Sequence, residues 1–338
     1  MNVLHWHITD AESFPYESST YPELSAKGSY NAASATYSQQ QIAELLTYAY
    51  DRGVLIMPEF DMPGHTASYR NSHPEVMADC PEYLVKWPAW DNIAMNPTIN
   101  ATYELVQALI AEVAATFPNR FMHLGGDEVK ASCWISDAQI RTYMQDNGYA
   151  TLENGTWVYD APALQNTFEQ RVQQMALANN KRPVFWEEVF TNGAELDAAS
   201  VVNVWLGTAS LSAALSANLS VVMSYGWYLD RQAPTCDTNP ICKTNWMWEW
   251  TWHDMYLVEP LAGINASLLD TSLLLGGEAS SWAESVDDTN TDGRVWSRAP
   301  AVSERLWSAE SIRDINFAQP RFSSFHCKIR VRDRLLAC

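Results

Sequence analysis

The sequence predicts an α/β protein built as a (β/α)8 barrel in which about seven of the eight strands are present. Short, continuous apolar runs alternate with segments of helical periodicity, and polar or aromatic residues follow nearly every apolar run. Continuous apolar runs are typical of strands buried on both faces of a parallel sheet. Polar residues after nearly every strand favour a barrel over an open doubly wound sheet, which gathers such residues at one switch point.

Seven apolar runs are predicted to be strands. In chain order they are VLHWHITD (3–10), VLIMPEFDMPGH (54–65), FMHLGGDE (121–128), PVFWEE (183–188), SVVNVWLG (200–207), LSVVMSYGWYLD (219–230) and LLLGGEASSWAE (273–284). Since the barrel has eight strands and the first run begins at residue 3, we expect one strand upstream of Met1.

Helical patterns lie between these runs. Ser38 and Gln41 have the spacing of a capping box, and Gly53 is placed to end the helix that follows. Apolar residues three or four positions apart indicate this helix and two others: Ile42, Leu45, Leu46 and Ala49; Leu105, Leu109 and Val113; and Leu164, Phe168, Val172 and Met175.

The chain is expected to form one catalytic barrel domain over residues 1–338, because no low-complexity linker interrupts it. Residues 231–262 form a long aromatic insertion between two predicted strands. A loop of this length is expected to contribute to a site and not to form a domain of its own.

The charge balance excludes some partners. Lys and Arg number 21 against 40 Asp and Glu, which gives a formal net charge of −19. Such a chain repels phosphate backbones and anionic lipid headgroups, so neither nucleic acid nor a membrane surface is an expected partner. The acidity fits an acidic compartment, and equally an ordinary soluble surface.

Cysteines and glycosylation sequons favour a secretory route. Cysteines at 236 and 242, and at 327 and 338, are close enough to form local disulfides, which leaves the pair at 80 and 133; this is one of 15 possible connectivities. The predicted disulfide residues are Cys80, Cys133, Cys236, Cys242, Cys327 and Cys338, and the predicted glycosylation sites are Asn100, Asn154, Asn218 and Asn265. Free cytosolic thiols are the alternative.

The N-terminal stretch MNVLHWHITDAESF has no basic region, long apolar region or cleavage site of a signal peptide. We therefore expect Met1 to be an internal position of a longer precursor whose signal peptide lies upstream.

Two adjacent acids, Asp127 and Glu128, end the third apolar run. Neighbouring residues in a strand point to opposite faces, so the two side chains can face one cavity only if the strand has already ended. Gly125 and Gly126 supply the backbone freedom for that turn. The alternative is a solvated loop pair or a helix N-terminus.

Acids and aromatic residues stand together at the other strand ends. Carboxylates suit sugar hydroxyls and aromatic faces suit the apolar side of a sugar ring, so the pattern predicts a carbohydrate pocket. A single Trp of this kind can equally be a core residue. The residues concerned are Asp10, Asp61, His65, Glu187, Glu188, Tyr228, Asp230 and Glu284, with Trp186, Trp205, Trp227 and Trp282.

No cofactor or metal site is predicted. His5 and His7 share a strand face, but neither has a zinc-type spacing with a third ligand. We expect His65 to link carboxylates in the site, and His5, His7 and His123 to be hydrogen-bonded core residues. Walker, dinucleotide-binding and G-x-S-x-G motifs are absent from the sequence.

Several long motifs in the same order resemble the β-N-acetylhexosaminidases of glycoside hydrolase family 20, in particular the eukaryotic lysosomal or secreted type. They are MNVLHWHITDAESFP, EFDMPGHTASY, HLGGDEV, WYLD, GGEASSWAESVD, RVWSRAPAVSERLW and HCKIRVR, and they cover essentially the whole chain. The resemblance implies a (β/α)8 domain that removes terminal N-acetylglucosamine, and often N-acetylgalactosamine, from the non-reducing ends of glycans. It also implies a lysosomal or secreted location and a possible homodimer.

The same resemblance implies a substrate-assisted mechanism, in which the 2-acetamido carbonyl of the sugar is the nucleophile. Glu128 would be the general acid and then the base, Asp127 would orient the acetamido N–H and stabilise the oxazolinium ion, and Tyr228 would hold the acetamido carbonyl. The implied substrate-binding residues are Trp186, Trp205 and Trp282 as walls of the acetamide pocket, Asp230 and Glu284 for outer hydroxyls, and Asp10 and His65 as links to Glu128.

The sequence departs from the family at its start. Members carry an arginine for the sugar hydroxyls on the first barrel strand and a smaller α/β domain before it, and this chain begins at what resembles the second strand. The alternative to an active enzyme is therefore a catalytically impaired, glycan-binding homologue. A third possibility is a double-displacement glycosidase for sugars that lack an acetamide.

Overall fold

The computed structural model describes residues 1–81, 93–230, 250–265, 267, 269–284 and 286–332, and the chain divides into two compact units, Met1–Val202 and Asn203–Cys338. Each unit is described by itself. A single domain over the whole chain stays a prediction. Among the described residues, no helix combines the length and the apolar character needed to cross a membrane.

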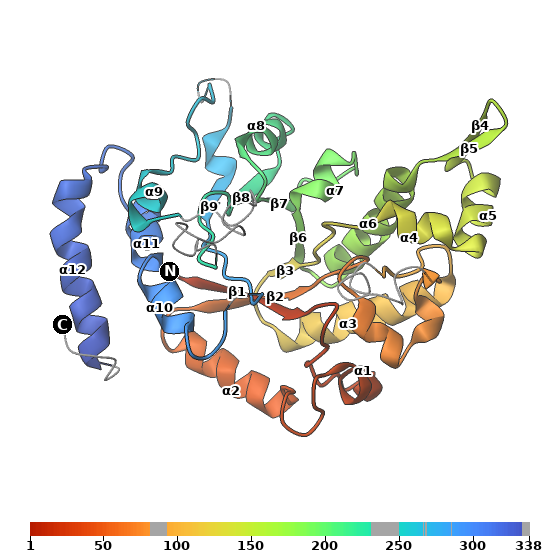
Figure 1. Cartoon of the computed structure of the whole chain (residues 1–338), viewed down its shortest axis with the longest axis horizontal. Helices are drawn as coiled ribbons and strands as arrows, with labels where there is room; N and C mark the ends of the chain where they lie inside the picture. Colours follow the sequence, from red (N-terminus) through yellow and green to blue (C-terminus); the bar gives the residue numbers. More distant parts are fainter. Residues whose placement is uncertain (82–92, 231–249, 266, 268, 285, 333–338) are drawn as a thin grey trace, which may run out of the picture. The chain divides into compact units, whose positions relative to one another are not determined.

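The first unit alternates strands and helices (Figure 1). Its elements are β1 (Val3–Thr9), α1 (Pro22–Gly28), α2 (Gln39–Tyr50), β2 (Leu55–Phe60), α3 (Asn100–Thr116), β3 (Phe121–His123), α4 (Ala131–Ser136), α5 (Ala138–Asp146), β4 (Ala150–Glu153), β5 (Thr156–Tyr159), α6 (Ala161–Ala178), β6 (Arg182–Trp186) and α7 (Glu187–Thr191), with 3-10 turns at Ala67–Asn71 and Pro74–Val76.

Strand β7 (Val201–Val204) crosses the boundary between the units. The second unit continues with α8 (Thr208–Ser216), β8 (Ser220–Met223), α9 (Trp252–Leu257), a 3-10 turn at Thr271–Leu273, β9 (Leu274–Gly277), α10 (Thr291–Trp296), α11 (Ala299–Trp307) and α12 (Ile315–Arg332).

Seven strands form one sheet in the order β1-β2-β3-β6-β7-β8-β9. The pairs β1–β2, β2–β3, β3–β6 and β8–β9 are all parallel. Each of the seven predicted apolar runs contains one of these strands, so the predicted (β/α) class with about seven strands is confirmed. The strands are shorter than the runs because the backbone leaves the sheet before the polar residues at each run's end.

Parallel register sets which side chains meet in the first unit. His7 of β1 is opposite Glu59 of β2, and Glu59 is opposite His123 of β3. Because the carboxyl ends of parallel strands meet at one edge of the sheet, the segments after β1, β2 and β3 also converge. Charged and polar side chains from three separate runs are thereby gathered in one place.

The predicted helices are present, and α2 is capped as the sequence indicates. Ser38 Oγ accepts from the Gln41 N–H at the start of α2, and the Gln41 side chain accepts from the Ser38 N–H, which completes the capping box. Gly53 follows the end of α2 with φ +71°. The predicted apolar faces of α3 and α6 are largely buried in the core of the first unit.

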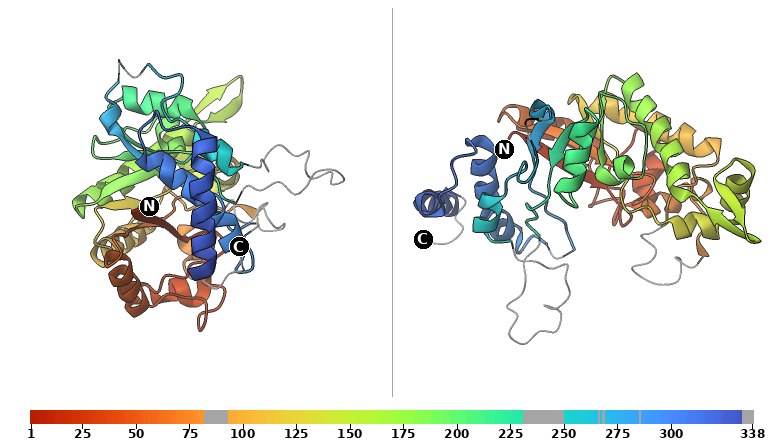
Figure 2. Two further views of the ribbon diagram at one scale, coloured as in Figure 1. Left: turned by 90° about the vertical axis from the view of Figure 1, so that its left-hand side faces the viewer. Right: turned by 90° about the horizontal axis from the view of Figure 1, so that it is seen from above.

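An antiparallel hairpin of β4 and β5, which the sequence analysis did not predict, projects from the first unit (Figures 1 and 2). Asn154 and Gly155 form its turn with φ +50° and +80°. An Asn-Gly pair between two short β-prone segments is the signal that could have revealed it. Asn154 is one of the four predicted glycosylation sites, and all four asparagines are exposed.

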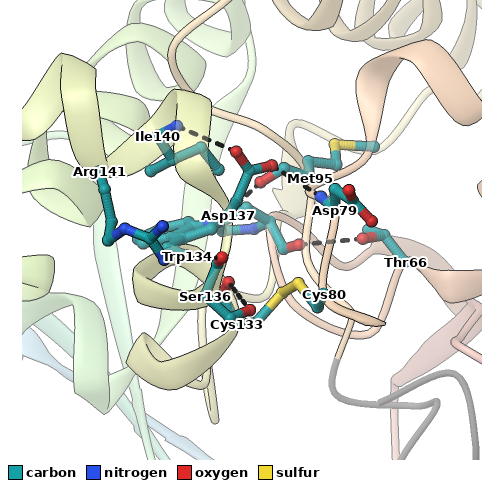
Figure 3. Close-up of a disulfide and its surroundings, with 11 residues drawn as sticks. Thr66, Asp79, Cys80, Met95, Cys133, Trp134, Ser136, Asp137, Ile140 and Arg141 are labelled. Atoms are coloured by element: carbon teal, nitrogen blue, oxygen red, sulfur yellow. Dashed lines mark hydrogen bonds between the residues drawn. A yellow bond between two sulfur atoms is a disulfide. The ribbon is translucent and has the colours of Figure 1, made fainter. Parts of the chain in front are cut away.

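One predicted disulfide joins Cys80 and Cys133, which are separated by 53 residues (Figure 3). Its surroundings are held by Asp137, whose carboxylate accepts from the backbone N–H groups of Asp79, Gln139 and Ile140 at 2.7, 2.8 and 3.0 Å. Cys236, Cys242 and Cys338 lie outside the described residues. Their pairings, including the one with Cys327, therefore stay predictions.

Candidate active site

The turn after β3 carries Asp127 and Glu128, and its backbone is left-handed at three positions. Gly125 has φ +71°, Gly126 has φ +94° and Glu128 has φ +51°. A Cβ atom on Gly125 would lie 1.6 Å from Asp61 Oδ1, and one on Gly126 would meet a neighbouring methyl carbon at 2.3 Å. The two glycines are therefore required both for the backbone conformation and for the space around it.

Asp127 and Glu128 differ in their exposure to solvent but approach the same imidazole. The Asp127 side chain is 12% exposed and that of Glu128 is 47% exposed. Asp127 Oδ2 and Glu128 Oε2 each lie 3.7 Å from His65 Nε2. Glu128, the more open of the two, is thus the acid better placed to exchange a proton with a bound molecule.

Asp10 holds His65 in this position. Asp10 Oδ1 is 3.1 Å from His65 Nδ1 and also accepts from the Ala11 N–H at 2.6 Å. The Asp10 carbonyl accepts from Ser68 Oγ at 2.7 Å, which fixes the backbone of the same residue. The structure therefore brings together four residues that the sequence analysis selected: Asp10, His65, Asp127 and Glu128.

A fully buried carboxylate, Glu59 of β2, lies among three histidines and was missed by the sequence analysis. Its Oε1 accepts from Trp186 Nε1 at 2.8 Å and lies 2.9 Å from His123 Nδ1. Its Oε2 lies 2.8 Å from both His5 Nε2 and His7 Nδ1. The three histidines thus have a carboxylate neighbour, as expected, but only His123 is a core residue, and His5 and His7 are half-buried. A charged residue inside an apolar strand is the signal that could have identified Glu59.

Charges within this cluster shift its pKa values strongly. Burial alone would raise the pKa of Glu59, but His123, His7 and His5 outweigh it and hold that pKa well below its usual range. Burial would lower the pKa of His7, but Glu59 and Asp10 raise it well above 6.5. The pKa of Asp10 is lowered against burial by its hydrogen bonds to His65 and His7.

Asp61 and Asp127 form a buried pair of acids beside His65. The Gly126 N–H donates to Asp61 Oδ1 at 2.9 Å, and side-chain atoms of Asp61, His65 and Asp127 lie within 4.8 Å of one another. Burial and the charge of Asp127 raise the pKa of Asp61 well above its ordinary value. Burial also raises the pKa of Asp127, but His65 and Asp61 oppose that rise. These surroundings make Asp61 the more readily protonated of the two acids and Asp127 the more readily ionised.

Helix α6 supports the turn from its other side. Gln165 Nε2 donates to the Gly126 carbonyl at 2.8 Å. The fully buried Glu169 lies close enough that its Oε1 would be 3.0 Å from a Cβ on Gly126. Burial raises the pKa of Glu169 well above its ordinary value, which favours the neutral form of this second acid beside the turn. Neither residue was singled out from the sequence.

Three sets of side chains have atoms close enough to be considered for a cation: His5–Glu59–His123, His7–Glu59–Asp61 and Asp61–His65–Asp127. In the first two, nitrogen and oxygen are 2.8 to 2.9 Å apart. Tetrahedral zinc would hold such ligands about 3.3 Å apart, since its bonds are about 2.0–2.1 Å long. The observed distances are shorter than such a site would hold, and the absence of a metal stays a prediction.

In the second unit, the buried Arg298 and the half-buried Arg294 fix the segment that carries Tyr228 and Asp230. Arg298 donates to the Leu229 carbonyl, and to the Trp250 carbonyl at 3.0 Å. Arg294 donates to the Asp230 carbonyl at 2.8 Å. Tyr228, which is buried, forms a parallel bridge with Ser280. Two arginines of the RVWSRAP motif thereby hold the backbone next to Tyr228, a predicted site residue in a distant part of the sequence.

The tryptophans differ in their environments. Trp227 is fully buried and donates from Nε1 to the Met255 carbonyl at 2.9 Å, so it is a core residue and not part of the pocket that the sequence pattern predicted. Trp186 is buried against Glu59, whereas Trp205 and Trp282 are half-buried. Glu284 is exposed. The assembly of the second unit's residues with Asp127 and Glu128 stays a prediction.

Residues 1–310 match the catalytic domain of glycosyl hydrolase family 20. The chain is 37% identical to human beta-hexosaminidase subunit beta over 331 residues, which are 97% of this chain and 55% of that protein. It is 35% identical to beta-hexosaminidase subunit A1 of Dictyostelium discoideum over 331 residues, covering 98% and 58% of the two chains. The chain thus spans somewhat more than half the length of these relatives.

Solved structures show the same architecture. A chitobiase from Flavobacterium johnsoniae has a TM-score of 0.78 and 27% identity, and the match covers 96% of this chain and 46% of that one. An exo beta-N-acetylglucosaminidase from Vibrio harveyi, solved in complex with N-acetylglucosamine, has a TM-score of 0.82 and 23% identity over 99% and 54% of the two chains. The second likeness bears on the fold alone.

Proposed function

The chain belongs to glycosyl hydrolase family 20, and we propose that it provides the catalytic domain of an exo-acting β-N-acetylhexosaminidase. Its substrate would be a terminal, non-reducing N-acetylglucosamine or N-acetylgalactosamine of a glycan. The observation that carries the proposal is the placement of two adjacent acids of unequal exposure, Asp127 and Glu128, at equal distance from one imidazole nitrogen of His65.

Asp127 and Glu128 would have different catalytic roles because their surroundings differ. Asp127 is buried beside Asp61, which takes up a proton more readily, and near His65, which favours the ionised form of Asp127. As a carboxylate, Asp127 would orient the acetamido N–H and stabilise a positive ring. Glu128 is open to solvent, so it can reach the glycosidic oxygen. Because the substrate would supply its own nucleophile, the enzyme needs only to stabilise the positive charge and to transfer the proton.

In the first step the acetamido carbonyl oxygen bonds to the anomeric carbon while the glycosidic carbon–oxygen bond breaks. The leaving oxygen takes the proton of Glu128, and the positive charge of the oxazolinium ion lies near Asp127. In the second step Glu128 takes a proton from water, whose oxygen bonds to the anomeric carbon and reopens the ring. The configuration at the anomeric carbon is retained.

The remaining substrate contacts are proposed from the family motifs. Tyr228 would hold the acetamido carbonyl, and its backbone is fixed through its neighbours by Arg294 and Arg298. Trp186, Trp205 and Trp282 would wall the acetamide pocket, and Asp230 and Glu284 would bind outer hydroxyls.

We further propose a lysosomal or secreted location and glycosylation at the four sequons. The Cys80–Cys133 disulfide and the exposure of Asn100, Asn154, Asn218 and Asn265 support an oxidising, glycosylating route. A homodimer is proposed on the family resemblance alone.

Replacement of Glu128 tests the function. With a chromogenic N-acetylglucosaminide, Glu128→Gln is expected to lower kcat by about 10²- to 10⁴-fold, the usual contribution of a general acid. Glu153→Gln on the exposed hairpin is the matched control and should keep the wild-type rate. Both variants should unfold at the wild-type temperature.

A thiazoline analogue of the cyclic intermediate separates the alternatives. Competitive inhibition by this analogue is expected if the substrate supplies the nucleophile. Turnover without inhibition would indicate double displacement by an enzyme carboxylate. Binding of N-acetylglucosamine without any turnover by the wild-type chain would identify a catalytically impaired, glycan-binding homologue.

A further inference from the structure

We propose that His7 and Glu59 are positioning residues that extend the Asp10–His65–Glu128 chain into the sheet and fix the orientation of the general acid. The inference deepens the proposed function and rests on the role of Glu128 given there. It concerns two residues that the proposed mechanism does not otherwise use.

The contacts form a continuous series from the sheet interior to the exposed acid. Glu59 Oε2 is 2.8 Å from His7 Nδ1, and His7 Nε2 is 2.8 Å from Asp10 Oδ2. The other oxygen of Asp10 binds His65 Nδ1 at 3.1 Å, and His65 Nε2 faces Glu128 Oε2 at 3.7 Å. Within the series, His7, Asp10 and His65 each have one atom near the preceding group and a different atom near the following group.

The surroundings of His7 favour a positively charged ring. Both of its ring nitrogens lie 2.8 Å from carboxylate oxygens, one of Glu59 and one of Asp10. An ionised carboxylate next to each ring nitrogen favours a proton on that nitrogen, so the two contacts favour the imidazolium form of His7. The raised pKa of His7, which Glu59 and Asp10 produce against the effect of burial, agrees with this state.

The imidazolium determines which oxygen of Asp10 is available to His65. With Oδ2 bound to His7, Asp10 turns Oδ1 to His65 Nδ1 and keeps the ring from rotating. His65 Nε2 is then directed at Asp127 and Glu128. Without His7, Asp10 would lose both a donor and a neighbouring positive charge.

Other charged groups also face this part of the cluster. Asp61 after β2 has an atom within 4.8 Å of His7 and Glu59, while His5 of β1 and His123 of β3 contact Glu59. Removing the positive charge of His7 leaves this set more negative by one unit. The remaining groups, including those that titrate during catalysis, should then bind protons more tightly.

Two substitutions separate the hydrogen bond from the charge. His7→Gln places an amide N–H near the position of Nε2 and can still donate to Asp10, whereas His7→Asn reaches only toward Glu59. We expect kcat to fall about 10- to 100-fold in His7→Asn and to stay within about threefold of wild type in His7→Gln, with KM little changed in both. Both variants should shift the limbs of the pH–rate profile to higher pH by about 0.5 to 1 unit.

His5→Gln is the matched control. His5 contacts the same Glu59 oxygen from the same strand face and is similarly exposed, at 14% against 19% for His7. The series to Asp10 runs through His7, so His5→Gln should shift the pH limbs less than either His7 variant does, even if it lowers the melting temperature. An equal shift in His5→Gln would overturn the specific role of His7.

A measurement without substrate keeps this inference separate from the proposed function. NMR of a ¹⁵N-histidine-labelled chain would show the protonation of each ring, and the two ring-nitrogen resonances missing in His7→Gln would identify His7. At pH 7.5 these resonances should have the chemical shifts of a doubly protonated ring. A neutral His7 ring at pH 6 would overturn the proposal. So would pH–rate profiles of both His7 variants that coincide with that of the wild type. If the wild-type chain turned over no substrate, the proposed function would fail while the spectrum still decided the state of His7.

Discussion

Two adjacent acids acquire different properties here because their immediate surroundings differ. Asp127 faces a buried acid and an imidazole, whereas Glu128 extends toward solvent from a left-handed backbone position. Sequence motifs selected Asp10, His65, Asp127 and Glu128, and the structure brings these four together. Glu59, Gln165 and Glu169 were missed, because a single charged or amide residue in an apolar context gives no spacing signal.

Glu169 provides a prediction about pH and stability. Its pKa is raised in the folded state, so the folded chain keeps a proton that the unfolded chain releases above about pH 4.3. Its contribution to stability is therefore complete below that pH and is lost as the pH rises toward the folded pKa. Glu169→Gln should become more stable than the wild type as the pH is raised from 4.5 to 7, as measured by urea unfolding.

Glu104→Gln on the exposed side of α3 is the control for this prediction. Its difference from the wild type should stay flat over the same pH range. A flat difference for Glu169→Gln as well would show that the buried acid is not kept neutral by the fold.

At the scale of elements, helix caps link parts of the chain that are distant in sequence. Asp137 begins α5 and also accepts from the Asp79 N–H beside the Cys80–Cys133 disulfide (Figure 3). One buried carboxylate thereby ties a helix N-terminus to a loop 58 residues earlier. This connection could not be seen in the sequence, where Asp137 has only the pattern of a local cap.

Removal of the Asp137 cap should lower the free energy of unfolding more than removal of an ordinary helix cap. Asp137→Ala is expected to lower the free energy of unfolding by about 3 kcal/mol, since it leaves several backbone donors without a charged acceptor. The exposed Asp160 caps α6 through one bond to the Ala163 N–H. Asp160→Ala should therefore lower the free energy of unfolding by only about 1 kcal/mol. Urea unfolding would measure both, and equal losses would contradict the bridging role of Asp137.

Prediction of elements succeeded where local signals were strong. Apolar runs located all seven strands, and the capping box at Ser38 located α2. The β4–β5 hairpin and helices α4 and α5 were missed, because they are short and their stability comes from packing against neighbours more than from their own periodicity.

For the whole molecule, the formal charge of −19 is the dominant surface property. Self-repulsion of a strongly acidic chain opposes compactness, and salt screens it. The melting temperature at pH 7 should therefore rise by a few degrees between about 10 and 150 mM NaCl. An equal rise with a neutral osmolyte at matched osmolality would show that screening is not the cause.

The sequence by itself determined the class of fold, the order of the strands along the chain and the turn that carries Asp127 and Glu128, because apolar runs, helical periodicity and glycine depend on local chemistry. Only the tertiary structure decided that Glu59 meets three histidines, that Trp227 is a core residue and that the pKa of Asp61 is raised beside Asp127. The register between parallel strands and the depth of burial set those outcomes, and both arise from contacts between residues far apart in the chain.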